Sequence, residues 1–168
     1  MATWKRFSTD APDLAARARA LLDSTTNGVL GTTRADGTPR LSGIDPFFLD
    51  GELWIGSMPG ARKGADLRRD PRMALHGIPW ESRKVKDGAA DPGEGDVKLT
   101  GRAVLLDDDE RYAEVMAWFR EEHGQEPPGP SDLFVIDLAE VVVVSVADDQ
   151  LQIDRWSAAE GRKTVRRS

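Results

Sequence analysis

The hydrophobic residues near the start of the chain recur at the spacing of a helix. Four of them share one helical face: Leu14, Ala18, Leu21 and Leu22. The segment before them, Asp10-Ala-Pro-Asp13, supplies a capping side chain and a proline suited to a first helical turn. The pattern predicts an amphipathic helix over residues 11–23, within an N-terminal helical segment of residues 1–24.

The following part of the chain is typical of short β-strands separated by turns. We expect strands at 29–33, 38–49, 52–57, 73–78 and 97–105, and a short helix at 61–69. The pairs Asp36-Gly37 and Asp50-Gly51 are strong hairpin signals, because Asp-Gly adopts the tight turns that join antiparallel strands. Pro46 lies within the second run and indicates an irregularity or an edge position there.

The last third of the chain predicts one helix and further strands. The acidic block Asp107–Glu110 is suited to open a helix over residues 107–123, because carboxylates cap a helix and complement its dipole. The run Val141–Val144 is typical of a strand that is buried on both faces, so something must cover both of its sides. A final hairpin through Asp148-Asp149 leads to a basic tail over residues 162–167.

These elements predict one domain that is mainly β with short helices. Seven or eight strands joined by short turns favour antiparallel, meandering connections, and a β-barrel closes such a sheet with few exposed edges. We expect a single domain over residues 1–168, with a barrel core at 27–106, the helix at 107–123, and the final strands and tail at 132–168.

Composition narrows the classes of function. The formal net charge of −6 disfavours a general attraction to nucleic acid, which is driven by clustered positive charge. There is no cysteine, so disulfides, thiolate metal sites and cysteine nucleophiles are excluded, and we expect no metal site. No run is apolar enough for a membrane helix or a signal peptide, and we expect a cytoplasmic protein.

Candidate chemistry gathers between Arg40 and Lys63. If the second and third predicted strands pair through the turn at Asp50-Gly51, Arg40 and Ser42 lie across from residues 56–59. Arg40 then reaches the place where Ser57, Arg62 and Lys63 emerge. A phosphate is held by this combination of guanidinium, ammonium, hydroxyl and the free N–H groups of a loop that enters a helix. The segment therefore predicts a phosphate site.

Other residues admit more than one interpretation. Trp80 and Trp156 either wall a cleft for a ring or fill the core. Arg68, Arg69 and Arg72 are expected to form surface ion pairs with Asp66, Asp70 or neighbouring acids. His76 is expected to be a packed or partly exposed strand residue, with a general base as the alternative, and His123 to lie as a favourable charge near a helix C-terminus.

The same stretch resembles the pyridoxamine 5'-phosphate oxidase-like, FMN-binding split-barrel family, including its branch that uses the deazaflavin F420. The resemblance is carried by residues 30–40, by Gly56-Ser57, by Arg62-Lys63 and by residues 67–75. It implies a split β-barrel, a homodimer with cofactor sites at the interface, and FMN, with F420 as the alternative. The cofactor-binding residues that it and the hairpin indicate are Arg40, Ser42, Gly43, Gly56, Ser57, Met58, Arg62 and Lys63.

The chain also departs from this family. It ends in Arg162–Ser168 and does not show the Arg-Leu-x-Pro ending of the oxidase proper, so the resemblance does not point to vitamin B6 oxidation. The leading hypothesis is an FMN- or F420-dependent oxidoreductase that acts on a small molecule, with no side chain clearly assigned to acid–base work. The alternative is a binding protein for a flavin, a deazaflavin or a haem-related ligand that does not turn over.

Overall fold

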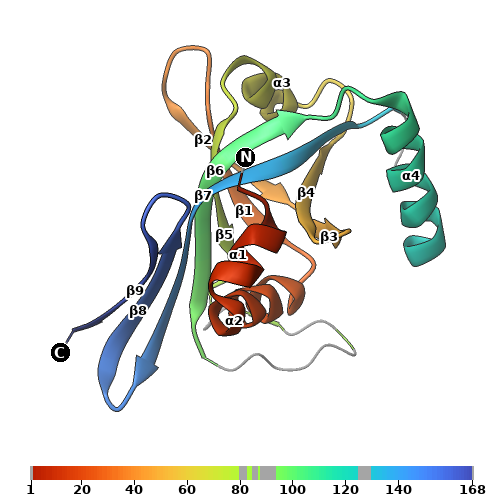
Figure 1. Cartoon of the computed structure of the whole chain (residues 1–168). Coiled ribbons are helices and arrows are strands. Elements are labelled where there is room, and N and C mark those ends of the chain that lie inside the picture. Colours follow the sequence, from red (N-terminus) through yellow and green to blue (C-terminus); the bar gives the residue numbers. More distant parts are fainter. Residues whose placement is uncertain (1, 80–82, 85–86, 88–93, 125–129, 168) are drawn as a thin grey trace.

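The computed structural model of the chain describes residues 2–79, 83–84, 87, 94–124 and 130–167, and its strands form one antiparallel sheet (Figure 1). The helices are α1 (Trp4–Asp10), α2 (Pro12–Asp23), α3 (Arg62–Arg69) and α4 (Asp109–His123). The strands are β1 (Gly28–Thr33), β2 (Pro39–Ile44), β3 (Phe47–Leu49), β4 (Glu52–Ser57), β5 (Arg72–Gly77), β6 (Asp96–Leu105), β7 (Asp132–Ala147), β8 (Gln150–Ser157) and β9 (Gly161–Arg167).

Within this sheet the strands follow the order β2-β1-β5-β6-β7-β4-β3, and β8 and β9 continue from β7 as an extension. The sheet curls around the core, while the β8–β9 hairpin projects away from the body of the molecule (Figure 1). The mainly antiparallel split β-barrel expected from the sequence is confirmed. Most of the segment between the predicted strands at 73–78 and 97–105, and residues 125–129 after the predicted helix at 107–123, lie outside the described residues.

The expectation of one continuous second strand over residues 38–49 is wrong. The segment forms two strands, of which β2 pairs with β1 and β3 pairs with β4, at opposite ends of the strand order. The break falls at Asp45-Pro46, where proline has no N–H for a ladder and restricts the residue before it. The first four strands therefore do not form a simple meander, because the β3–β4 hairpin lies beyond β7.

The main core is built from the inner face of the sheet and the two N-terminal helices. The sequence pattern predicted α2 but missed α1, whose first turn is capped by the Thr3 hydroxyl accepting from the Arg6 N–H. Phe7 of α1 is fully buried, and its ring centre lies 4.9 Å from that of Trp156. Trp156 thus fills the core, while Trp80 lies outside the described residues.

The valine run of β7 is buried by this chain alone. Val141 and Val143 have no exposed surface and join the main core, and Val142 on the opposite face is 7% exposed. The expectation of a strand buried on both faces is confirmed. Cover from a second copy of the chain is not required at these residues.

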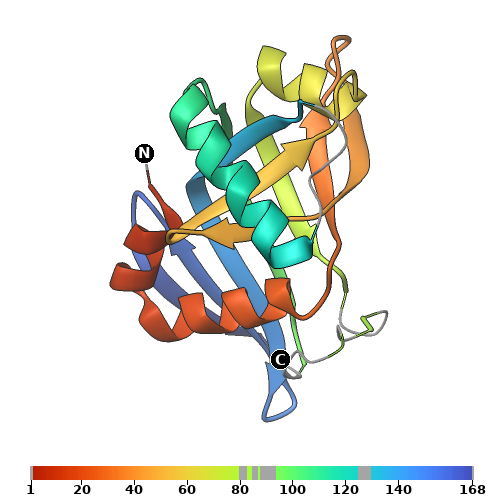
Figure 2. The same cartoon turned by 90° about the vertical axis from the view of Figure 1, so that its right-hand side faces the viewer.

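A second, smaller core lies between α4 and the other face of β4. Leu53 and Ile55 belong to the main core, whereas Trp54 between them packs with Val115 and Met116 of α4. Figure 2 shows α4 crossing in front of the β3–β4 hairpin. Asp108 caps α4 by accepting from the backbone N–H of Arg111 in the first helical turn at 2.9 Å, as the acidic block predicted. No helix in the described part of the chain is long and apolar enough to cross a membrane.

The C-terminal residues expected as a basic tail form β9. The hairpin is fixed to α2 through Asp154, which is 2% exposed and accepts from the Thr164 hydroxyl at 2.5 Å. Arg17 of α2 and Arg162 of β9 approach the same carboxylate at 3.6 and 3.5 Å. Burial raises the pKa of Asp154, but the hydrogen bonds and the arginines outweigh it, so the pKa lies below its ordinary value.

A candidate phosphate-binding cleft at the open seam of the barrel

A cleft of about 260 Å³ lies where the end of β2 faces the end of β4 and the start of α3. Five of the eight predicted site residues line it: Gly43, Gly56, Ser57, Met58 and Lys63. The remaining three, Arg40, Ser42 and Arg62, do not. The predicted pairing of Arg40 and Ser42 with residues 56–59 is wrong, because β2 pairs only with β1. The curvature of the sheet brings the two strand ends to one cleft instead.

The turn from β4 into α3 leaves the start of that helix without a capping side chain. Gly60 adopts a φ of +73°, which glycine tolerates without strain, and the Ala61 N–H donates to the carbonyl of Met58 at 3.1 Å. Ala61 then occupies the cap position and has no side chain that accepts from the helix. The first backbone N–H groups of α3 therefore have no side-chain acceptor.

The charges in the first turn of α3 oppose its dipole. The turn holds Arg62 and Lys63 and no acidic residue, although a helix N-terminus favours negative charge. Lys63 donates from Nζ to the carbonyl of Gly43 at 2.7 Å and so ties α3 to β2 across the cleft. Arg62 is exposed and forms no ion pair with any residue that the structure describes. Two cations thus lie where an anion would be stabilised.

Ser57 contributes a buried hydroxyl that has no partner. Its side chain at the end of β4 is 3% exposed, and Oγ makes no hydrogen bond with any residue that the structure describes. Gly64 of α3 packs directly against it: a Cβ at Gly64 would lie 2.6 Å from Ser57 Oγ and 3.0 Å from Asp132 Oδ2. Glycine is therefore required here for the first turn of α3 to approach β4. Sequence reasoning missed Gly64, because no local signal reveals which strand a short helix will touch.

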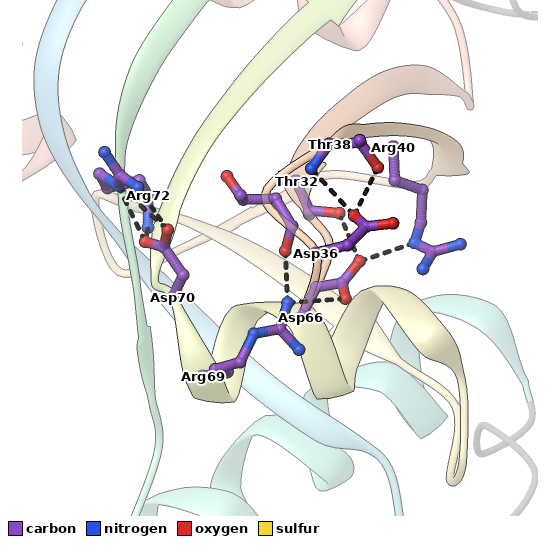
Figure 3. A network of polar contacts seen from close by, with 9 residues as sticks. Thr32, Asp36, Thr38, Arg40, Asp66, Arg69, Asp70 and Arg72 are labelled. Atoms are coloured by element: carbon purple, nitrogen blue, oxygen red, sulfur yellow. Dashed lines mark hydrogen bonds and ion pairs between the residues drawn. The ribbon is translucent and has the colours of Figure 1, made fainter.

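Arg40 is held beside the cleft by a buried carboxylate of α3. Its Nε donates to Asp66 Oδ2 at 2.6 Å, and Asp66 is 3% exposed. Asp66 also accepts from the hydroxyl of Thr32 at 3.0 Å and from Nη2 of Arg69 at 3.1 Å (Figure 3). Burial raises the pKa of Asp66, yet these hydrogen bonds outweigh burial and hold the pKa below its ordinary value. Asp66 is therefore an ionised, buried anchor, whereas its sequence context predicted only a partner in surface ion pairs.

The arginines at the end of α3 and the start of β5 form the expected ion pairs. Arg69 pairs with Asp66, Arg72 pairs with Asp70 at 2.6 Å, and Arg68 pairs with Asp132 of β7. Hydrogen bonds from Arg72 lower the pKa of Asp70 to about 2. These side chains fix α3 to the sheet.

The apolar wall of the cleft comes from parts of the chain that the sequence analysis did not assign to the site. Phe47 of β3 and Phe119 of α4 line it, with ring centres 4.7 Å apart at 70°. Ser131 also lines the cleft, and its backbone N–H donates to the hydroxyl of Tyr112 of α4 at 3.1 Å. Only the position of α4 over the β3–β4 hairpin brings these groups to the cleft.

This arrangement suits binding of an anion attached to a flat apolar group. The helix start with its free N–H groups, a buried hydroxyl and the Lys63 ammonium border the cleft, Arg62 lies next to Lys63, and aromatic and aliphatic side chains complete the lining. Among the described residues, no group of three or more histidine, aspartate or glutamate side chains is placed to hold a metal ion.

Comparison with solved structures shows the same fold. ChuZ from Campylobacter jejuni has a TM-score of 0.67 and 13% identity, over 89% of this chain and 61% of that protein. The heme binding protein from Mycobacterium smegmatis has a TM-score of 0.59 and 22% identity, over 84% of this chain and 56% of that protein. PhzG from Burkholderia lata 383, in complex with tetrahydrophenazine-1-carboxylic acid, has a TM-score of 0.58 and 14% identity, over 94% of this chain and 89% of that protein.

The chain thus spans less than two thirds of the length of the first two proteins. No curated protein matched the sequence. The family model described as pyridoxamine 5'-phosphate oxidase matches residues 14–145, which include β1 to β6, α3 and most of β7. The chain therefore belongs to the pyridoxamine 5'-phosphate oxidase family.

Proposed function

We propose that this protein is an oxidoreductase that holds the phosphate of FMN at the start of α3, with the deazaflavin F420 as the alternative cofactor. The observation that carries the proposal is the Ser57 hydroxyl, which is buried without a partner beside the uncapped first turn of α3. Family membership adds support, because FMN is the cofactor of the family.

A phosphate at this place would remove two unfavourable features at once. A buried hydroxyl without a hydrogen bond costs about 1–3 kcal/mol. Cations at a helix N-terminus are disfavoured by about 0.3–1 kcal/mol each. A phosphate bound there would accept from the Ser57 hydroxyl and from the α3 backbone, and its charge would pair with Arg62 and Lys63. The residues present therefore fit the group.

Arg40 is suited to complete the phosphate site from β2. Asp66 engages its Nε, and neither Nη group makes a hydrogen bond with a residue that the structure describes. The carboxylate fixes the guanidinium while leaving its two outer donors for a phosphate oxygen. Ser42, two residues further along β2 and half-buried, is the less direct candidate in this set.

Two glycines leave room beside the strands for a flat ring. A Cβ at Gly43 would meet nothing within 4 Å, and one at Gly56 would meet only Leu133 at 3.8 Å. Met58 and Phe119 border the same space. Bound there, the ring of the cofactor supplies hydride transfer. The residues of the chain bind the phosphate, orient the ring against β4 and exclude water on the side of α4.

A second candidate function is binding without turnover, with a haem-related ligand as one occupant. Its support is the similarity in fold to the heme binding protein from Mycobacterium smegmatis. On this chain an exposed imidazole, His123, lies beside the rings of Trp118 and Phe119. Titration with hemin separates the two candidates, since a flavoprotein without haem affinity leaves the Soret band of free hemin unchanged.

The proposed active form is a homodimer with cofactor sites at the interface. Two large apolar side chains near the cleft support a partner surface: Leu41 is 75% exposed and Met58 is 59% exposed. Met58 lines the cleft, and Leu41 lies two residues before the lining residue Gly43. Sedimentation velocity of the purified protein tests this form, and a monomer at micromolar concentration would contradict it.

Calorimetric titration of the purified protein with FMN and with F420 tests the cofactor. We expect micromolar or tighter binding of one of them, and binding of neither would overturn the proposal. Arg62→Ala with Lys63→Ala should weaken that binding by at least about tenfold, because charged hydrogen bonds contribute about 1.5–3 kcal/mol each.

The matched control removes two adjacent cations elsewhere. Arg166→Ala with Arg167→Ala changes the net charge equally on β9, far along the extension from α3 (Figure 1). We expect this control to bind the cofactor like the wild type. Equal dissociation constants for both double variants would refute the phosphate assignment.

A further inference from the structure

A second cavity of about 470 Å³ lies next to the phosphate cleft, between the end of α2, the start of β3 and the last turns of α4. Asp45, Phe47 and Phe119 line both cavities. The two spaces are therefore neighbours along one depression, with Phe47 and Phe119 between them. We call the second space the aromatic chamber.

The walls of the aromatic chamber are aromatic rings. Phe47 and Trp118 are stacked, with centres 5.3 Å apart and planes at 18°. Phe48 also lines the chamber, with the guanidinium of Arg19 at 3.8 Å from its ring centre. All three aromatic side chains are only half-buried, although aromatic residues contribute most to stability when fully covered. Rings that line a cavity with part of their surface uncovered favour a flat aromatic ligand.

The charges of the chamber differ in sign from those of the cleft. Four carboxylates line it, those of Asp23, Asp45, Asp87 and Glu122, against one guanidinium, that of Arg19. Arg19 forms an ion pair with Asp23, and Asp45 accepts from the side-chain amide of Asn27. Asp87 and Glu122 form no ion pair within the described part of the chain. The chamber is therefore net negative.

We propose that the aromatic chamber binds a flat aromatic molecule that is neutral or positively charged. The ligand would stack against Phe47 and Trp118, and a cationic group on it would meet the ring faces and the carboxylates of Asp87 and Glu122. A carboxylate or phosphate on the ligand would be repelled by the same groups. The chamber adjoins the cleft assigned to the cofactor, so the ligand would be the substrate; this step rests on the proposed function. The binding of the ligand does not rest on the proposed function.

Three naphthalene derivatives with a small substituent of different charge at the same ring position test the proposal on cofactor-free protein. They are 1-naphthylmethylammonium, 1-naphthalenemethanol and 1-naphthoate, titrated by calorimetry at pH 7. We expect the ammonium to bind about tenfold more tightly than the carboxylate, and the alcohol to lie between them. The proposal is overturned if none binds, or if the carboxylate binds as tightly as the ammonium.

Variants on α4 locate the binding. Trp118→Ala should weaken ammonium binding by about tenfold, whereas Trp118→Phe, which keeps a ring for stacking, should restore most of it. Glu122→Gln should reduce the preference for ammonium over carboxylate by about twofold to threefold, because an exposed charge is screened. Its control is Glu121→Gln, which removes the same charge one residue away on α4 and outside the chamber. Equal effects of Glu122→Gln and Glu121→Gln, or none of Trp118→Ala, would place the ligand elsewhere.

The same titrations separate this inference from the proposed function. Arg62→Ala with Lys63→Ala should lose cofactor affinity but bind 1-naphthylmethylammonium like the wild type. If the wild type binds the ammonium but neither FMN nor F420, the ligand site in the chamber is supported and the proposed cofactor is refuted. If it binds a cofactor but none of the naphthalene derivatives, the proposed cofactor is supported and the ligand site in the chamber is refuted.

Discussion

The polar groups at the start of α3 and those in its C-terminal half differ in whether they are hydrogen-bonded. In the C-terminal half, Asp66 binds Arg40, Arg69 and Thr32, and both of its carboxylate oxygens have partners (Figure 3). Beside the N-terminal end, the Ser57 hydroxyl of β4 is buried without a partner in the described part of the chain, and the first turn has no side-chain cap. One helix of eight residues thus lies between a fully hydrogen-bonded set of polar groups and one that is not.

The difference indicates which end serves stability and which serves a ligand. Buried polar groups in folded proteins are nearly always hydrogen-bonded, so the network at Asp66 is what folding alone produces. The unpartnered groups at the start of α3 are explained if something outside the chain completes them. Substitutions at the two ends should therefore change different measured quantities.

The largest effect is expected from Asp66→Ala. It removes three hydrogen bonds and leaves the part-buried guanidinium of Arg40 without its partner, so the free energy of unfolding should fall by about 3 kcal/mol. Urea unfolding of the apo protein measures it. Asp70→Ala is the control, since its pair with Arg72 is exposed, and its effect should be much smaller. Similar losses for both variants would mean that burial of Asp66 contributes nothing.

The contribution of Asp66 should also depend on pH. Its pKa in the folded protein is lowered, so its stabilisation is complete above the ordinary aspartate pKa of about 4 and is lost as pH falls through the lower, folded value. Urea unfolding of the wild type and Asp66→Asn should therefore show the widest difference at pH 7 and a narrowing difference below about pH 4. A difference that stays constant down to pH 3 would contradict the ionised anchor.

Gly64→Ala tests the close contact between α3 and β4. The new Cβ would lie 2.6 Å from Ser57 Oγ, so the free energy of unfolding should fall by about 1–3 kcal/mol. Adding Ser57→Ala removes that oxygen and should recover part of the loss. Gly43→Ala, where a Cβ meets nothing within 4 Å, should leave stability close to that of the wild type. Loss of stability at Gly43 but not at Gly64 would show that α3 lies elsewhere.

The smallest effect on stability, and the sharpest contrast, is expected from Ser57→Ala. Removal of an unpartnered buried hydroxyl should leave the apo protein unchanged or more stable by about 1 kcal/mol. Affinity for the cofactor should fall in the same variant, because the phosphate loses a donor. Urea unfolding and calorimetric titration of one preparation measure both. A destabilised apo protein with unchanged affinity for the cofactor would mean that Ser57 stabilises the fold and does not bind the ligand.

Local signals predicted most of the elements correctly. The Asp-Gly pairs at Asp50-Gly51 and near Gly37 mark real turns, with φ values of +53° at Asp50, +76° at Gly51 and +83° at Gly37. The acidic cap of α4 and the buried valines of β7 also agree with the pattern. In each case the responsible residues lie close together in the sequence.

The errors concern relations between distant parts of the chain. Pro46 indicated an irregularity in the predicted second strand. No local signal, however, shows that β2 and β3 lie at opposite ends of the strand order. The composition of residues 162–167 is that of a solvated tail, and only pairing with β8 makes it a strand. For the site, residue types in the right segment identified five of the cleft's lining residues, while Phe119 and Gly64 depend on how α4 and α3 pack.

The break at Asp45-Pro46 has a consequence for how quickly a ligand can enter and leave. The ends of β2 and β4 both border the cleft, and no ladder hydrogen bond joins these two strands within the described sheet. Strands in a fully closed barrel must exchange many hydrogen bonds for solvent before they separate. Here the two borders can part by bending the two-residue link, and side chains, not a strand ladder, tie β2 to α3: Lys63 donates to the Gly43 carbonyl, and Arg40 donates to Asp66. Ligand exchange can therefore be fast without any loss of sheet structure.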